Sequence, residues 1–401
     1  MSIKLNLYLV PFILLTASLF LASGCSKKKK GSTLPIEELS VDRDCAIINT
    51  RPLVKRSTYS TTSALAVTEI TQTIGEGGYY TGSFVVPSHA ISFLLSIFKD
   101  SYNVKFSSLT DPDGTNILSN SSTPNLYNDA SGSLGGYGYA NVLLPQSPDF
   151  SAKPGTWTFK ANNNDGVKLI TRSGSDPSDN TTILVQSYIT ATTWSASDIS
   201  AALTIMKKIY SRNGITLTVK NTITISDTQY AKVSNNFTDN TTSALISQGS
   251  TDGLNLFFVQ DQLENTTYLG KASGMPGSMG IANSWNGVLI FLDTHAFGTT
   301  LDAQLLGETA AHEIGHHLGL FHTTESGGKQ FDILSDTLEC PRSTQDNNSD
   351  RRVSAEECEG YGGGNLMFWT SWSSSSRSAG KKQEVLCKYQ QQVLKYSPLA
   401  K

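Results

Sequence analysis

A cluster of histidines between residues 312 and 322 is the strongest chemical signal in this 401-residue chain, because four of its six histidines fall there. His312 and His316 are four residues apart, so on a helix both imidazoles lie on one face, roughly 6 Å apart along the axis. Two imidazole nitrogens at that spacing can bind one metal ion. Glu313 lies beside the first histidine, where its carboxylate can reach a water at the metal without binding the ion. The pattern predicts metal-assisted hydrolysis.

A third ligand follows the predicted helix. Gly319 ends the helix, and the chain can then turn back and bring His322 to the same ion. Three protein nitrogens leave one coordination position open to water, which is typical of a catalytic rather than a structural zinc site. We therefore expect Zn²⁺ on these three histidines. His317 fits no ligand position and is expected to be structural, whereas His89 and His295 are expected at the surface or as hydrogen-bonded core residues.

The full pattern H-E-x-x-H-x-x-G-x-x-H, from His312 to His322, resembles the metzincin clan of zinc endopeptidases. Members of this clan also carry a methionine in a tight turn beneath the metal, downstream of the third histidine. The stretch G-G-G-N-L-M-F-W at 362–369 supplies such a methionine, Met367. The resemblance implies that Met367 supports the histidines from below and does not bind the ion.

Further motifs resemble one metzincin family, the pappalysins. In the family's order they are D-I-L-S-D-T at 332–337, the cysteines Cys340 and Cys358, and N-L-M at 365–367. The stretch 270–280 resembles the edge-strand region of the family, and the similarity as a whole covers residues 183–396. Leu338 departs from the usual proline. Trp369 stands where a tyrosine is common, so a tyrosine near the metal cannot be carried over.

The resemblance implies a zinc endopeptidase that acts on protein or peptide substrates, with Glu313 as the general base. The substrate would lie extended and add a strand to the edge of the domain. Related enzymes bind calcium near the D-T segment, so Asp332 and Asp336 are candidate Ca²⁺ ligands, with ordinary surface-loop carboxylates as the alternative. A second function stays open, namely a surface-exposed binding or adhesion lipoprotein that retains a zinc-peptidase fold. The intact Glu313 speaks against it, because a binding protein does not need that base.

The histidines need a helix and a sheet to hold them, and the sequence predicts both within residues 183–401. One helix is expected over 301–319, and an earlier one begins at Ser195, where Ser195 and Asp198 resemble a capping box, and ends at Gly214. Strands are expected at 183–189, 215–225, 254–259 and 288–292, and a closing helix over 382–396. This order of elements indicates an α/β catalytic domain.

Residues 62–172 have a different pattern, with short alternating stretches broken by turn residues, which predicts an antiparallel β-sandwich. L-T-D-P-D-G-T at 109–115 and P-G-T-W-T-F at 154–159 resemble the jelly-roll accessory domains of secreted proteases; any bacterial surface sandwich is the alternative. Residues 173–182 form the predicted linker. The predicted fold class is α+β multidomain: an N-terminal antiparallel β-sandwich followed by a metzincin-type α/β zinc peptidase domain.

Residues 1–24 have the features of a signal peptide that ends in L-A-S-G-C, similar to a bacterial lipobox. Their apolar stretch contains a proline and is shorter than the ~20 residues that span a bilayer. Cys25 would then be acylated, and residues 25–61 would form a tether to the membrane. An ordinary secretory signal is the alternative. The expected location is the bacterial cell envelope, extracytoplasmic and lipid-anchored.

Acylation of Cys25 would leave four cysteines, and an exported domain in oxidising surroundings would pair them as two disulfides. The favoured pairs are Cys340–Cys358 and Cys45–Cys387. Cys45 could instead bind the zinc as a thiolate and keep the enzyme latent, and this alternative stays open at the level of the sequence.

The composition excludes some other classes of function. Charged residues make up only 16% of the chain and the net charge is −3, so a polycationic nucleic-acid binder is excluded as the default and no nucleic-acid partner is expected. The 15 tyrosines, 16 phenylalanines and 5 tryptophans argue against wholesale disorder. The oligomeric state is not indicated by the sequence.

Overall fold

The computed structural model describes most of the chain from residue 44 onward. The described ranges are 44–56, 59–60, 62–98, 104–118, 135–136, 138–162, 166–177, 181–264 and 267–401. The predicted signal peptide and the acylation site Cys25 lie outside them. Within these ranges, none of the helices is long and apolar enough to cross a membrane.

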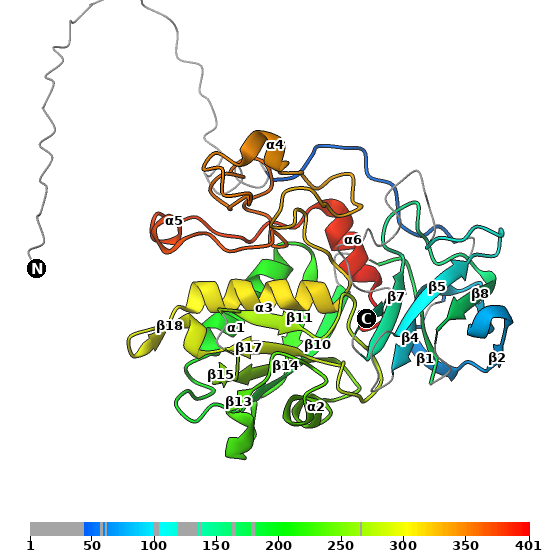
Figure 1. Cartoon of the computed structure of the whole chain (residues 1–401), viewed down its shortest axis with the longest axis horizontal. Helices are drawn as coiled ribbons and strands as arrows, with labels where there is room; N and C mark the ends of the chain where they lie inside the picture. The colour runs from blue at the N-terminus through cyan, green and yellow to red at the C-terminus, as the bar shows by residue number, and fades with distance from the viewer. Residues whose placement is uncertain are drawn as a thin grey trace, which may run out of the picture.

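Two antiparallel sheets make up residues 62–173, which we call the N-terminal unit (Figure 1). The first has the order β1 (Ala64–Glu69), β9 (Lys168–Ser173), β4 (Ala90–Phe98), β7 (Tyr139–Leu144). The second has the order β2 (Gln72–Ile74), β3 (Tyr80–Val86), β8 (Gly155–Ala161), β5 (Val104–Thr110), β6 (Gly135–Gly136). Side chains of both sheets share one hydrophobic core, in which the rings of Phe93 and Trp157 have centroids 5.1 Å apart. Buried residues alternate with exposed ones along β8, the period of two on which the prediction of strands rested.

A mixed sheet of six strands organises the described part of residues 181–401, which we call the C-terminal unit. Its order is β11 (Ile215–Val219), β10 (Thr181–Ile189), β14 (Leu254–Val259), β17 (Val288–Phe291), β16 (Gly270–Ala272), with β12 (Ile223–Thr224) also pairing with β10. All pairs are parallel except β16–β17, which is antiparallel. The short strand β16 therefore forms one edge of the sheet.

Helices cover both faces of this sheet, because its central strands are apolar on both sides. In β14, Leu256 and Phe258 belong to the core under α1 (Ser200–Ser211) and α3 (Ala303–His317), whereas Phe257 and Val259 belong to the core under α2 (Asn240–Ile246). The helix α6 (Lys388–Tyr396) packs into the same core as α1 and α3.

The remaining elements are short. They are the strands β13 (Lys232–Val233), β15 (Asp261–Gln262), β18 (Ala296–Phe297) and β19 (Thr300–Leu301), the helices α4 (Arg342–Gln345) and α5 (Ser374–Ser378), and the 3-10 turns η2 (Glu76–Gly78), η4 (Thr228–Tyr230) and η5 (Asp293–His295).

Two helices begin later than the sequence predicts. The carboxylate of Asp198 accepts hydrogen bonds from the N–H and the hydroxyl of Ser195, at 2.8 and 2.7 Å, and closes a turn ahead of α1 instead of capping it. At the C-terminus, Val385 is held by the N–H of Leu366, which donates to its carbonyl at 2.7 Å, so residues 382–387 are not helical. In both places a hydrogen bond overrides the helical periodicity.

The described part of the predicted tether, residues 44–56, packs on the C-terminal unit. Leu53 and Val54 are buried in its core. Ala46 donates its N–H to the carbonyl of Asp336 at 2.8 Å. These residues therefore belong to the folded body rather than to a solvated tether.

Both disulfides favoured from the sequence are present. Cys45–Cys387 joins the N-terminal segment to the start of α6, and Cys340–Cys358 closes a loop with a sequence separation of 18. Cys45 thus has no free thiolate, which leaves the latency alternative without its ligand.

Candidate active site

Helix α3 carries the first two histidines and Glu313 on one rigid element. Its N-terminus is capped by Asp302, whose carboxylate accepts a hydrogen bond from the N–H of Leu305 at 3.0 Å. Three turns later, His312 and His316 lie on one face, with ring centroids 4.6 Å apart. The predicted spacing of the first two ligands is therefore realised.

The helix ends in a turn that reverses the chain. Gly319 has a φ of +106°, in the left-handed region that favours glycine. Its N–H donates to the carbonyl of His316 and the N–H of Leu320 donates to that of Gly315, both at 2.9 Å. This pair of bonds is the Schellman pattern of helix C-termini. The turn brings His322 back toward the helix, as the glycine in the sequence predicted.

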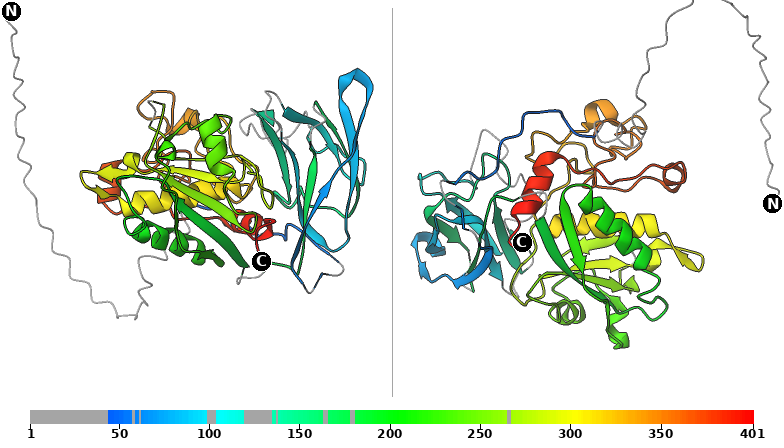
Figure 2. Two further views of the ribbon diagram at one scale, coloured as in Figure 1. Left: turned by 90° about the horizontal axis from the view of Figure 1, so that it is seen from below. Right: turned by 180° about the vertical axis from the view of Figure 1, so that it is seen from behind.

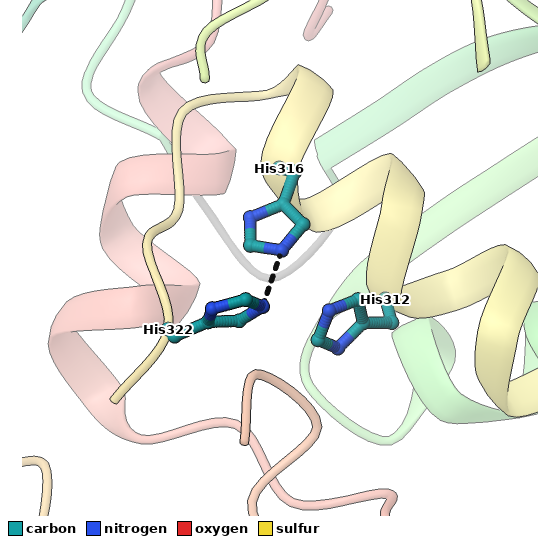
Figure 3. Close-up of side chains that lie close together, drawn as sticks. All are labelled: His312, His316 and His322. Carbon is teal, nitrogen blue, oxygen red and sulfur yellow. Dashed lines mark hydrogen bonds between the residues drawn. The ribbon is translucent and has the colours of Figure 1, made fainter. Parts of the chain in front are cut away.

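The three imidazoles of His312, His316 and His322 point toward one place (Figure 3). One nitrogen of each lies within 4.8 Å of the other two, and the Nε2 atoms of His316 and His322 are 3.0 Å apart. Among the residues that the structure describes, this is the one group of three or more His, Cys, Asp or Glu side chains that could hold a metal ion.

Each of these histidines is oriented through its Nδ1. The acceptors are the Leu366 carbonyl for His312 at 2.6 Å, the Leu320 carbonyl for His316 at 2.7 Å, and the Glu325 carboxylate for His322 at 3.0 Å. Because these oxygens only accept, each Nδ1 carries a proton, and in the neutral imidazole that binds a metal each Nε2 then presents a lone pair. Lone pairs that face each other across 3.0 Å repel unless a cation lies between them. The residues therefore fit a zinc ion, and their Nδ1 partners fit the usual support of zinc-binding histidines.

Burial keeps the imidazoles of His312 and His316 neutral, the form that binds a metal. Burial and the nearby His322 lower the pKa of His312 to about 3. The same two causes, burial first and then the neighbouring histidines, lower the pKa of His316 well below its ordinary value. No proton has to leave these two nitrogens when a metal binds near neutral pH.

Glu313 is held against the edge strand β16. Its Oε2 accepts a hydrogen bond from the N–H of Ala272 at 2.7 Å. A Cβ on Gly270 would lie 2.8 Å from the Cγ of Glu313, so the strand approaches this closely because residue 270 has no side chain. Burial raises the pKa of Glu313 to about 7, and the Ala272 N–H opposes that rise.

Met367 lies in a turn directly under α3. A Cβ on Gly315, between the two helical histidines, would be 2.5 Å from the Met367 Sδ, so the thioether packs on the helix backbone. The Met367 N–H donates to Asn365 Oδ1 at 2.8 Å. Asn365 and Gln390 exchange two amide hydrogen bonds, at 2.9 and 3.1 Å, which tie the turn to α6.

The candidate calcium ligands Asp332 and Asp336 accept hydrogen bonds from the protein. Asp332 Oδ1 accepts from the Thr337 hydroxyl at 2.5 Å and from the Leu334 N–H at 3.1 Å. Asp336 Oδ2 accepts from the N–H of Tyr389 in α6 at 2.8 Å. Within the described ranges, these carboxylates belong to no group of three potential metal-binding side chains. A calcium site stays a prediction.

The other histidines lie where the sequence analysis expected. His295 is a buried, hydrogen-bonded residue whose Nδ1 donates to the Phe291 carbonyl at 2.7 Å and whose Nε2 lies 3.1 Å from the Thr309 hydroxyl. His317 is buried at the last residue of α3, with its Nδ1 3.4 Å from the Ser273 hydroxyl. His89 is exposed.

Sequence reasoning missed the hydrogen-bond partners of the site residues, and Glu325 and the N–H of Ala272 illustrate two different reasons. Glu325 could have been found, since a carboxylate three residues after a ligand histidine is a candidate acceptor for its Nδ1. The N–H of Ala272 could not, because a backbone donor leaves no residue-type signal and its place depends on the pairing of β16 with β17.

Comparisons with known proteins find a metallopeptidase domain in this part of the chain. Residues 196–323 match the family model for metallo-peptidase family M12B, reprolysin-like. An extracellular metalloprotease of Colletotrichum graminicola is 39% identical over 95 residues, which is 22% of this chain and 32% of that protein. One of Neurospora crassa is 32% identical over 166 residues, 39% of this chain and 52% of its own. The chain thus spans a third to about half of the length of these curated relatives.

Among solved structures, an archaemetzincin of Methanopyrus kandleri is similar over 53% of this chain and 93% of its own, with 14% identity and a TM-score of 0.30. That likeness is too weak to support an argument about function. The family match carries more, because it contains α1, α3 and all three histidines. The chain therefore combines a mixed α/β fold with a metallopeptidase-like domain, and the histidine cluster lies inside that domain.

Proposed function

We propose that this protein is a zinc-dependent endopeptidase that hydrolyses peptide bonds of protein substrates. The observation that carries the proposal is the convergence of the His312, His316 and His322 nitrogens beside Glu313. The match to a reprolysin-like metallopeptidase model over the same residues supports it. The binding or adhesion alternative has no support in the comparisons, because the relatives that match this chain are extracellular metalloproteases.

The chain's own residues divide the work of hydrolysis. The three histidines would hold the ion through Nε2, and a bound Zn²⁺ supplies acidification of the attacking water and polarisation of the scissile carbonyl. Glu313 takes the proton from the attacking water and passes it to the leaving amine. The hydrogen bond from Ala272 holds the Glu313 carboxylate beside the histidines during both transfers.

The substrate would bind along β16, the free edge of the sheet. The carbonyl of Leu269 and the N–H of Ser273 are used in hydrogen bonds with Phe291 and Gly287, at 3.0 and 3.1 Å. Because backbone groups of a strand alternate in direction, Gly270 and Ala272 present theirs away from β17. The N–H of Ala272 is used by Glu313, so the groups of Gly270 and the carbonyl of Ala272 are the ones offered to a peptide. An extended peptide could pair with this edge, next to Glu313.

We also infer finer assignments. The glycine turn after α3 and the methionine beneath it support a site of the metzincin type. The order of motifs supports the pappalysin family, and the two antiparallel sheets support an accessory β-sandwich. Acylation at Cys25 and a place in the cell envelope rest on the sequence alone. If Cys25 is acylated, Cys25→Ser will move the protein from the membrane fraction to the soluble fraction.

The test of the proposed function is cleavage of a broad peptide library by the purified, zinc-loaded chain. We expect wild type to cleave internal peptide bonds and Glu313→Ala to lose that activity while it keeps one equivalent of zinc. Glu339→Ala removes an exposed acid and serves as the control that keeps activity. Absence of cleavage by zinc-loaded wild type, or equal cleavage by Glu313→Ala, would overturn the proposal.

A further inference from the structure

Strand β7 of the N-terminal unit has two faces with different neighbours. Its Ala140, Val142 and Leu144 belong to the core between the two antiparallel sheets. Its Leu143 belongs instead to the core that contains α3, α6 and the mixed sheet, and Tyr139 packs against the core on the other face of that sheet. One strand therefore takes part in the cores of both units. Figure 2 shows the two units side by side, with the end of α6 between them.

The first contact of β7 is with the chain that leaves the edge strand β16. Asn141, fully buried, donates its side-chain N–H to the carbonyl of Pro276 at 3.0 Å. The rings of Tyr139 and Trp285 have centroids 4.1 Å apart. A Cβ on Gly274 would lie 2.7 Å from the Tyr139 ring, so the two chains are in direct contact. Gly274, Pro276 and Trp285 therefore lie against β7.

The second contact of β7 is with the turn that delivers the third histidine. A Cβ on Gly319 would lie 2.7 Å from Leu143 Cδ2 and 2.8 Å from Gln146 Nε2. Two residues later, Phe321 packs against the core of the N-terminal unit. His322 is the next residue, so the chain on its N-terminal side is packed on the N-terminal unit.

These two contacted segments also touch the end of α3. Gly277 donates its N–H to the carbonyl of His317 at 3.0 Å, and a Cβ on Gly277 would lie 2.1 Å from the ring of His317. The segment 274–277 thus lies between α3 and β7. A shift of β7 would be transmitted through packed atoms to α3 and to the turn at Gly319, because close-packed interiors transmit strain.

We propose that the N-terminal unit is a positioning part of the zinc site, and that Asn141 and Leu143 are its positioning residues. Leu143 fixes the turn that places His322, and Asn141 fixes the segment 274–277, which lies between β7 and the end of the histidine helix α3. The part of the proposal that concerns zinc binding stands on the histidine geometry alone; the part that concerns turnover rests on the proposed function.

The test uses the full chain with substitutions on the two faces of one strand. Leu143→Ala and Asn141→Ala alter the face toward the zinc site, and Val142→Ala alters the neighbouring residue that faces the opposite core. Zinc affinity is measured by competition with a chromogenic chelator, after cooperative unfolding has shown that each variant is folded. The values of kcat and KM are measured on a cleaved peptide.

We expect Leu143→Ala and Asn141→Ala to weaken zinc binding about 10–100-fold, the range seen when support of metal ligands is removed. In Leu143→Ala and Asn141→Ala the value of kcat should fall with little change in KM. Val142→Ala should keep wild-type zinc affinity even if its unfolding midpoint drops. The proposal is overturned if all three variants keep wild-type zinc affinity, or if Val142→Ala weakens zinc as much as Leu143→Ala. If wild type binds zinc and cleaves nothing, the proposed function fails and the zinc affinities still decide this inference.

Discussion

The carboxylate of Glu313 accepts a hydrogen bond from the backbone N–H of Ala272, with 2.7 Å between the two heavy atoms. This contact joins the helix that carries the histidines to the free edge of the mixed sheet, where an extended substrate would pair. It requires residue 270 to be glycine, because any Cβ there would lie 2.8 Å from the Glu313 side chain. The place of Glu313, the proposed general base, is thus set by a strand distant in sequence.

Gly270→Ala should displace Glu313 and lower kcat by about 10–100-fold, since a misplacement of about 1 Å can cost that much. Zinc affinity should stay at the wild-type value because no histidine contact is changed. The control is Gly327→Ala, where a Cβ would meet no atom within 4 Å. Steady-state kinetics with zinc quantification check this, and an unchanged kcat in Gly270→Ala would show that the contact does not position the base.

Glu325 accepts the Nδ1 proton of His322 at 3.0 Å and thereby keeps the Nε2 lone pair toward the metal position. Glu325→Ala should weaken zinc binding about 10–100-fold. Glu325→Gln keeps an acceptor oxygen and should recover part of the loss. Chelator competition measures both variants; equal zinc affinity in Glu325→Ala and wild type would mean that His322 does not need this partner.

The amide pair of Asn365 and Gln390 should behave as one unit. Both side chains are fully buried, so replacing either with alanine removes both bonds of the pair and leaves the other amide NH2 group without this acceptor, at a cost of about 1–3 kcal/mol in the free energy of unfolding. The double variant should lose less than the sum of the single losses, with an interaction energy of roughly 0.5–3 kcal/mol. Urea unfolding of the four proteins gives the cycle, and strict additivity would contradict the pairing.

Glu308 should make the protein less stable as pH rises. This buried side chain accepts a hydrogen bond from Gln304 at 2.6 Å, and burial raises its pKa from 4.5 to about 7. A raised pKa in the folded state gives a contribution to stability that is complete below pH 4.5 and is lost as pH rises through 7. Glu308→Gln should therefore gain stability relative to wild type between pH 5 and pH 8, up to about 3 kcal/mol.

This prediction is checked by measuring the midpoint of urea unfolding for wild type and Glu308→Gln at pH 5 and at pH 8. The exposed acid Asp252 gives the control, Asp252→Asn, which should follow wild type. A relative gain of stability by wild type on raising the pH would have the wrong sign for a buried carboxyl.

The convergence of the three histidines could be predicted from the sequence because its signal is local. His312 and His316 share a helix face, and Gly319 and His322 follow within a few residues. The role of Met367 was inferred from a family resemblance, and in the structure its side chain packs beneath α3. The pairing of Cys45 with Cys387 was inferred from the number of cysteines, and the structure has this disulfide at the start of α6.

The parts that sequence reasoning missed depend on contacts between distant residues. The capping pattern at Ser195 was read as a helix start, yet it closes a turn on its own. The sequence analysis treated the β-sandwich as a separate domain joined by a linker. It did not anticipate that Leu143 of this domain belongs to the core around α3. An apolar residue in a β-strand has the same sequence signature whether it faces its own sheet partner or another unit, so its neighbour is decided only by the assembled fold.

The most direct measurement is the rate of peptide hydrolysis by metal-free protein during titration with Zn²⁺. The proposed function predicts no hydrolysis without the ion, a rise in rate in proportion to added zinc, and a plateau at one equivalent, where His312, His316 and His322 are saturated. Full hydrolysis by the metal-free protein, or none at one equivalent of zinc, would contradict it.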